Sequence, residues 1–147
     1  MRLSKAAEYA VRCMLYLSVA GKGVLVSRRT VAGEMDIPEQ FLGKIAQQLA
    51  RAGLIEIIQG AKGGFRLTVL PAELTLLTVI EAVIGEMFLN DCILRPESCD
   101  RSPACKVHLV WENVRNQLRG SLRKATFETL ITEAPAFAPD SHNDSPS

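Results

Sequence analysis

The chain has 147 residues, of which 48% are apolar and 22% charged, so it is long and apolar enough for one domain with a real core. No apolar run approaches the length of a membrane span, and no secretory signal is evident at the start, so we expect a cytoplasmic protein with no membrane partner. The net charge of +1 hides an asymmetry. Residues 1–70 hold ten Lys and Arg against five Asp and Glu, whereas residues 71–147 hold seven against eleven. The basic first half suits a polyanionic partner, although a solvated basic surface gives the same balance.

The first helix is predicted over residues 4–20, with Ser4 as its N-cap. Its apolar face is formed at helical spacing by Leu3, Ala7, Ala10, Val11, Met14 and Leu17. Glu8 and Arg12 lie on the opposite face, in the order that favours an ion pair one turn apart. Cys13 falls among apolar neighbours, which predicts a small buried side chain.

Two shorter helices follow, separated by a turn at residues 36–38. The first is capped by Ser27 and covers Arg28–Met35, and the second begins at Pro38 and ends near Ala52. The apolar positions of the second helix are Phe41, Leu42, Ile45 and Leu49. This order predicts a helix–turn–helix.

Leu54–Ile58 and Phe65–Val69 have the composition of strands, and a glycine-rich segment joins them. Two helices followed by such a hairpin predict a mainly α fold with a β wing, a winged helix–turn–helix, whose second helix would enter the major groove of double-stranded DNA. The residues expected to contact DNA are Arg2, Arg28, Glu39, Gln40, Gly43, Lys44, Gln59, Gly60, Lys62 and Arg66. A glycine-rich tip can also be a simple turn, and some winged helices bind proteins, so the pattern leaves those alternatives open.

A mostly apolar helix over residues 75–85 is expected to pack against the first helix. The next stretch carries three of the four cysteines, Cys92, Cys99 and Cys105. Ser102 and Pro103 open a helix there, which places Cys105 in its first turn, where the helix dipole favours a thiolate. His108 shares a helix face with Cys105.

These donors suit a soft metal centre, and the spacing favours an iron–sulfur cluster. Six and five residues separate the successive cysteines, unlike the tight pairs of structural zinc sites. Zinc, a disulfide and free thiols remain alternatives, although cytosolic disulfides are uncommon.

The longest helix is predicted from Pro103 to Lys124, with one further turn over Thr126–Thr132. Its apolar stripe is close to a coiled-coil seam and consists of Val107, Trp111, Val114, Leu118 and Leu122. We expect this stripe to form a homodimer contact, with packing inside one chain as the alternative. The organisation predicted is a winged domain (1–70), a supporting helix and connector (71–91), a cluster-binding loop (92–105), a dimerisation helix (103–132) and a disordered tail (133–147).

Several stretches together resemble one family. They are the opening Met1–Val11, Phe41–Ile45, Leu49–Ile55 and Gly60–Leu67, together with the three loop cysteines. They resemble the iron–sulfur cluster regulators among the winged-helix transcription factors, the family of IscR, NsrR and RirA, over about residues 1–132. The resemblance implies a homodimeric transcription factor whose cluster state sets its DNA affinity in response to iron or cluster supply, oxidative stress or nitric oxide.

The resemblance also assigns roles to residues. Cys92, Cys99 and Cys105 match the three cluster cysteines, and His108 matches the fourth ligand of a [2Fe–2S] cluster. Glu8 is the alternative fourth ligand, because other relatives use an acidic residue there, and a [4Fe–4S] cluster stays open. Cluster-assembly proteins are a further partner that the resemblance leaves open.

The chain departs from the family pattern in three places. The first cysteine gap is one residue longer than in many relatives, Gly43 replaces a larger residue, and Gln59 replaces a frequent wing arginine. Two other functions remain as alternatives: a cluster-free regulator that responds through a thiol or a ligand, and an iron–sulfur redox module. No Ser–His–Asp set, phosphate loop or paired-carboxylate motif is evident, so we do not expect an enzyme.

Overall fold

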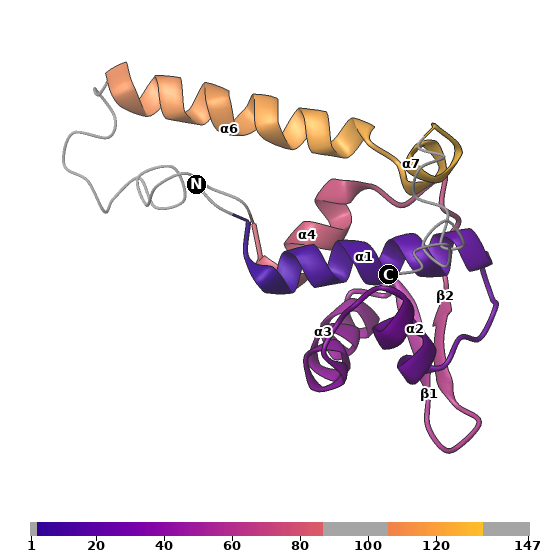
Figure 1. Cartoon of the computed structure of the whole chain (residues 1–147). Helices are drawn as coiled ribbons and strands as arrows, with labels where there is room; N and C mark the ends of the chain where they lie inside the picture. Colours follow the sequence, from indigo (N-terminus) through magenta and orange to yellow (C-terminus); the bar gives the residue numbers. More distant parts are fainter. Residues whose placement is uncertain (1–2, 87–105, 134–147) are drawn as a thin grey trace, which may run out of the picture.

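The computed structural model describes residues 3–86 and 106–133 (Figure 1). The elements in these two ranges are α1 (Lys5–Ala20), α2 (Arg28–Glu34), α3 (Glu39–Arg51), β1 (Ile55–Ile58), β2 (Gly64–Leu67), α4 (Leu76–Ile84), α6 (Lys106–Lys124) and α7 (Phe127–Glu133). Each corresponds to a predicted element, with ends that differ by a few residues. The predicted mainly helical fold with a two-stranded wing is therefore confirmed.

Helix α1 is the central element of the structure. The hydroxyl of Ser4 accepts a hydrogen bond of 3.2 Å from the backbone N–H of Ala7, as expected for an N-cap. The apolar face of α1 is buried and contacts α2, α3, α4, α7 and β2. Cys13 is fully buried on this face, as the sequence predicts.

The core continues across the predicted boundary at residue 70. Phe127 of α7 is fully buried in the same cluster as Leu42 and Leu49 of α3. In Figure 1, α2, α3 and the hairpin lie on one side of α1, and α4 and α6 lie on the other. The winged unit and the supporting helices therefore share one core through α1.

The C-terminal half of α6 is attached to α4. Leu118 and Leu122 pack against a small cluster formed by Ala7, Leu77 and Ile80. Arg119 donates two hydrogen bonds to the Glu81 carboxylate, at 3.0 and 2.8 Å. These hydrogen bonds raise the pKa of the Arg119 guanidinium above its ordinary value. Arg115 pairs with Glu86 next to it. These contacts fix the direction in which the rest of α6 projects.

The N-terminal half of α6 has a different environment. Large apolar side chains there are exposed, namely Val107 (53%), Leu109 (65%), Val110 (56%), Trp111 (38%) and Val114 (40%). The predicted apolar stripe therefore divides: its last two leucines pack inside the chain, and its first three residues face outward.

The wing is attached to the rest of the fold by a third extended segment. β1 and β2 pair antiparallel, and Val26 exchanges backbone hydrogen bonds of 2.9 and 2.8 Å with Phe65 on the outer edge of β2. Gly64 has a φ of +155°, and a Cβ at this residue would lie 2.1 Å from the carbonyl oxygen of Val26. A glycine is therefore required where the wing approaches this segment.

Gly64→Ala should lower the free energy of unfolding by about 3 kcal/mol, because it combines an unfavourable φ with a clash against backbone. Gly60→Ala is the matched control, since Gly60 also has a positive φ of +105° but has open space around it. The control should lose only about 1 kcal/mol. Urea unfolding followed by circular dichroism measures both; equal losses would show that the close approach to Val26 does not matter.

Candidate nucleic-acid interface

The first turns of α3 present a polar exposed face. Leu42, Ile45, Ala46 and Leu49 are buried, whereas Glu39, Gln40 and Lys44 are exposed and Gly43 is half-buried. The four residues of α3 that the sequence assigns to DNA contact therefore lie on the side of the helix away from the core.

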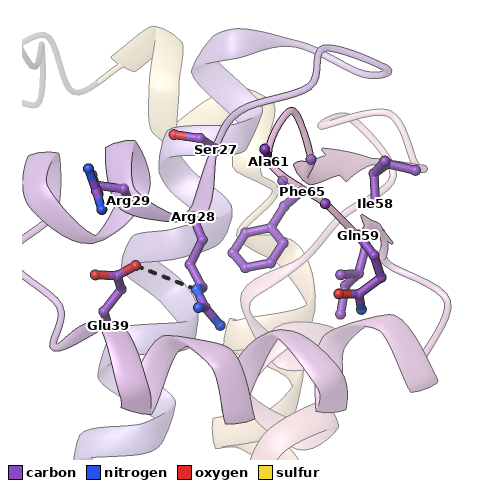
Figure 2. Close-up of a pocket in the computed structure, with 12 residues that line it drawn as sticks. Ser27, Arg28, Arg29, Glu39, Ile58, Gln59, Ala61 and Phe65 are labelled. Carbon is purple, nitrogen blue, oxygen red and sulfur yellow. Dashed lines mark ion pairs between the residues drawn. The ribbon is translucent and has the colours of Figure 1, made fainter.

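An open cleft of about 520 Å³ separates the start of α2 and α3 from the wing (Figure 2). Residues on its two sides include Arg28, Arg29 and Glu39 from the helices and Gln59 and Gly60 from the wing. The structure therefore brings four of the predicted contact residues, from three parts of the chain, to one cleft.

An arginine of α2 crosses to α3 at this cleft. The Nε of Arg28 lies 3.7 Å from Oε1 of Glu39, and both side chains are about half-exposed. The Nη1 of Arg28 lies 3.0 Å from the point that a Cβ at Gly43 would occupy. The absence of a side chain at residue 43 thus leaves room for the guanidinium, an arrangement that helical periodicity does not signal.

The tip of the wing exposes Gln59, Gly60 and Lys62. Arg66, also assigned to DNA contact, lies opposite Glu56 in the hairpin register and pairs with its carboxylate. Its guanidinium is therefore already engaged within the wing. Arg2 lies outside the described residues.

Arg12 connects α1 to the turn before α3. It donates hydrogen bonds to the carbonyl oxygens of Asp36, at 3.3 Å, and Met35, at 3.5 Å, and its guanidinium lies 5.4 Å from the centre of the Tyr9 ring. The predicted ion pair between Arg12 and Glu8 is wrong, because Glu8 pairs with Lys5 at 3.5 Å.

Phe41 was predicted on the apolar face of α3, and this is also wrong. Its side chain is 51% exposed and its ring lies 6.3 Å from the ring of Tyr9. The helical spacing puts Phe41 at the margin of the buried stripe, in the first turn of α3, beside Tyr9 of α1. Tyr9, Arg12 and Phe41 therefore form a contact between α1 and the start of α3.

The metal-site predictions fall largely on residues that are not described, since Cys92, Cys99 and Cys105 lie outside the two ranges. His108 lies in the first turn of α6, its side chain is 14% exposed, and its Nε2 is 3.9 Å from a carboxylate oxygen of Glu112. Within residues 3–86 and 106–133, no three His, Cys, Asp or Glu side chains gather as a metal site. The donor set of three thiols with an imidazole or a carboxylate fits an iron–sulfur cluster chemically.

The fourth cysteine has a different character. Burial raises the pKa of Cys13 to about 12, because the thiolate would lose its hydration inside the core. At pH 9, a thiol with the ordinary pKa is half ionised, whereas Cys13 would stay almost entirely protonated. Cys13 is therefore a core residue and not a candidate ligand or sensor.

A two-helix unit followed by a wing, with a polar exposed face on α3, defines a winged helix–turn–helix fold. The Rrf2 family, described as an iron-dependent transcriptional regulator, matches residues 3–133, and the chain belongs to this family. It is therefore a transcriptional regulator and not an enzyme. In the described part of the chain, no helix combines the length and the apolar character needed to cross a bilayer.

Relatives support the same assignment. The HTH-type transcriptional regulator NsrR of Shouchella clausii is 33% identical over 132 residues, which cover 89% of each chain. Two solved structures share the fold at 22% identity. They are IscR of T. potens, with a TM-score of 0.73 over 91% of this chain and 88% of that one, and CymR, the global cysteine regulator of B. subtilis, with a TM-score of 0.74 over 91% and 98%.

In the folded protein at pH 9, Cys13 should resist a thiol reagent such as Ellman's reagent, because its thiolate is nearly absent and its side chain is buried. Cys13→Ala should therefore give the same thiol count as the wild type under native conditions and a lower count only in denaturant. A lower native count for the variant would show that Cys13 is accessible.

Proposed function

We propose that this chain is a cytoplasmic homodimeric regulator that binds double-stranded DNA through α3 and the wing, with an affinity set by an iron–sulfur cluster. The observation that carries the proposal is the placement of α1. This one helix contacts the turn before α3 through Arg12, and its Ala7 belongs to the small cluster on which Leu118 and Leu122 of α6 pack. A change at the start of α6 can therefore reach the DNA-binding surface through two sets of contacts.

The DNA contacts follow from the exposed face of α3. Its first turns would enter the major groove with Glu39 and Gln40 toward base edges and Lys44 toward base edges or phosphates. The wing would approach the adjacent backbone, where Lys62 supplies charge and Gly60 allows close approach. The cleft between them would lie over the DNA where the major groove meets the adjacent backbone.

The cluster would be held by Cys92, Cys99 and Cys105, with His108 as the favoured fourth ligand and Glu8 as the alternative. When bound, it supplies a covalent link between the cysteine segment and the start of α6 and a reactive target for oxygen or nitric oxide. Its supply would come from cluster-assembly proteins. His108 lies in the first turn of α6, so a cluster bound there would act on the start of this helix. Glu8 lies on α1 one turn before Arg12, so a cluster bound there would act on the helix that contacts the turn before α3.

The contacts that link α6 to α3 through α4 and α1 would transmit the change. Arg119 and Leu118 hold α6 on α4 and α1, and Arg12 holds α1 on the turn that precedes α3. A shift of α6 would thus alter the spacing of the two recognition helices of a dimer. A typical coupling of about 1–3 kcal/mol changes affinity roughly 5- to 150-fold.

Replacing Cys92, Cys99 or Cys105 by Ala should abolish bound iron and visible absorbance after anaerobic purification, because thiolates are the ligands that hold such a cluster, while the circular dichroism spectrum should stay that of a folded chain. Cys13→Ala is the matched control and should keep its iron. A variant at one of the three positions that retained iron and colour would remove that residue from the site.

The same preparation tests the fourth ligand. About two irons per chain, lost in His108→Ala and kept in Glu8→Ala, would support a [2Fe–2S] cluster held by the histidine. About four irons, lost in Glu8→Ala, would favour the acidic ligand and a [4Fe–4S] cluster. DNA affinity of the iron-loaded and iron-free forms, measured on the same duplex, should differ by about 5- to 150-fold.

The exposed end of α6 supports a homodimer. Val107, Val110, Trp111 and Val114 lie on one face of the helix, and all are exposed in the single chain. A matching stripe on a second copy would cover them as in a coiled-coil seam. Two winged units brought together in this way would read two half-sites.

Val114→Glu should raise the dimer dissociation constant by at least about tenfold, because the seam would bury an unpaired carboxylate. Asn116→Glu places the same charge on the opposite face of α6, where residue 116 is exposed, and should leave the dimer intact. Sedimentation of both variants at equal concentration measures the effect. A Val114→Glu protein as dimeric as the control would exclude this face.

A second candidate is a cluster-free regulator that responds through a thiol or a small ligand. The similarity in fold to CymR, a global cysteine regulator, supports this second candidate. A protein without iron after anaerobic purification, which still dimerises and binds DNA, would support this candidate. Membership in a family of transcriptional regulators disfavours a redox module as the function.

A further inference from the structure

The recognition helix carries a glycine on its outward side, and an arginine from another helix lies over it. Gly43 is one turn after Glu39, so the two residues share a face of α3. Arg28, the first residue of α2, reaches Glu39 with its Nε at 3.7 Å and lies with Nη1 3.0 Å from the place of a Cβ at Gly43 (Figure 2). The guanidinium therefore occupies the surface that a side chain at residue 43 would otherwise cover.

We propose that Arg28 is a base-reading residue specific for guanine, held over Gly43 by Glu39. This inference rests on the proposed function, because it requires the first turns of α3 to enter the major groove. A guanidinium located between residues 39 and 43 would then meet base edges directly. With Nε turned toward Glu39, the two Nη groups remain as paired donors that match the O6 and N7 acceptors of guanine.

Glu39 gives the arginine its orientation. A carboxylate at the DNA surface would by itself repel phosphates, but the pair with Arg28 neutralises it locally. The same pair restricts the rotamers of a long side chain that is about half-exposed, so less freedom is lost when a base is bound. Arg29 follows on α2 and also borders the cleft, but Figure 2 shows its side chain directed away from Arg28. The adjacent arginines are therefore not equivalent.

The test is a selection of binding sites from a randomised DNA duplex library with the full chain. The wild type should enrich a guanine at one position of each half-site. Arg28→Ala should lose this enrichment, with the preference for guanine reduced about 5- to 100-fold and the other positions unchanged. Arg29→Ala is the matched control, since it removes the same charge from the next residue, and should keep the guanine.

Gly43→Ala tests the location of the guanidinium. The new Cβ would meet only the end of the Arg28 side chain, which can move, so the melting temperature should not fall. The displaced guanidinium should weaken the preference for the same guanine. In the Arg28→Ala background, Gly43→Ala should add nothing, because the two changes act through one group.

Two results would overturn the inference. One is an Arg28→Ala protein that loses affinity equally for all sequences and has a salt dependence lower by about one charge, which identifies a phosphate contact. The other is an unchanged guanine preference. If Arg28→Ala failed to fold, Glu39→Gln would serve instead, since release of the guanidinium should weaken the same base position. A wild-type chain that bound no duplex would overturn the proposed function itself, and this is distinct from either result.

Discussion

Burial of one face of α1 is the interaction on which the remaining elements depend. Ala7 and Ala10 have no exposed surface, and their small side chains allow neighbouring helices to approach α1 closely. Every described element contacts α1 or packs on a neighbour that does. Such a core transmits displacement because it is close-packed, which is what the proposed coupling of α6 to α3 requires.

The sequence predicts the helices well because their signals are local. Ser4 and Ser27 accept the expected hydrogen bonds from the backbone three residues later, and the apolar positions of α1 recur at the spacing that buries one face. The same reasoning failed for Arg12 and Phe41. An arginine ends far from its own backbone, and its acceptors here are two carbonyl oxygens that only the folded turn brings near. Phe41 has the right spacing, but half of its side chain stays exposed beside the Tyr9 ring.

The sequence predicted which segments form the candidate site, but not how their side chains are arranged. Periodicity identified the polar face of α3 and the glycine-rich tip, but it could not show that Arg28 and Gly43 would meet. The prediction for the apolar stripe of α6 has the same limit, because the spacing of apolar residues does not show whether the same chain or a second copy covers them. The structure divides the stripe: Leu118 and Leu122 pack on the core of their own chain, and Trp111 and Val114 face outward.

Two glycines illustrate how the fold and the interface place separate demands on the sequence. At Gly64 the backbone of Val26 leaves no room for a Cβ, so the fold itself requires glycine. At Gly43 the helix would form better with alanine, since glycine costs about 1 kcal/mol within a helix, and the nearest obstacle is the movable end of Arg28. No backbone contact therefore explains the glycine of α3. The space that Gly43 leaves is filled by the Arg28 side chain from α2. The proposed contact of Arg28 with a base would give a functional reason for a glycine that lowers the stability of the helix.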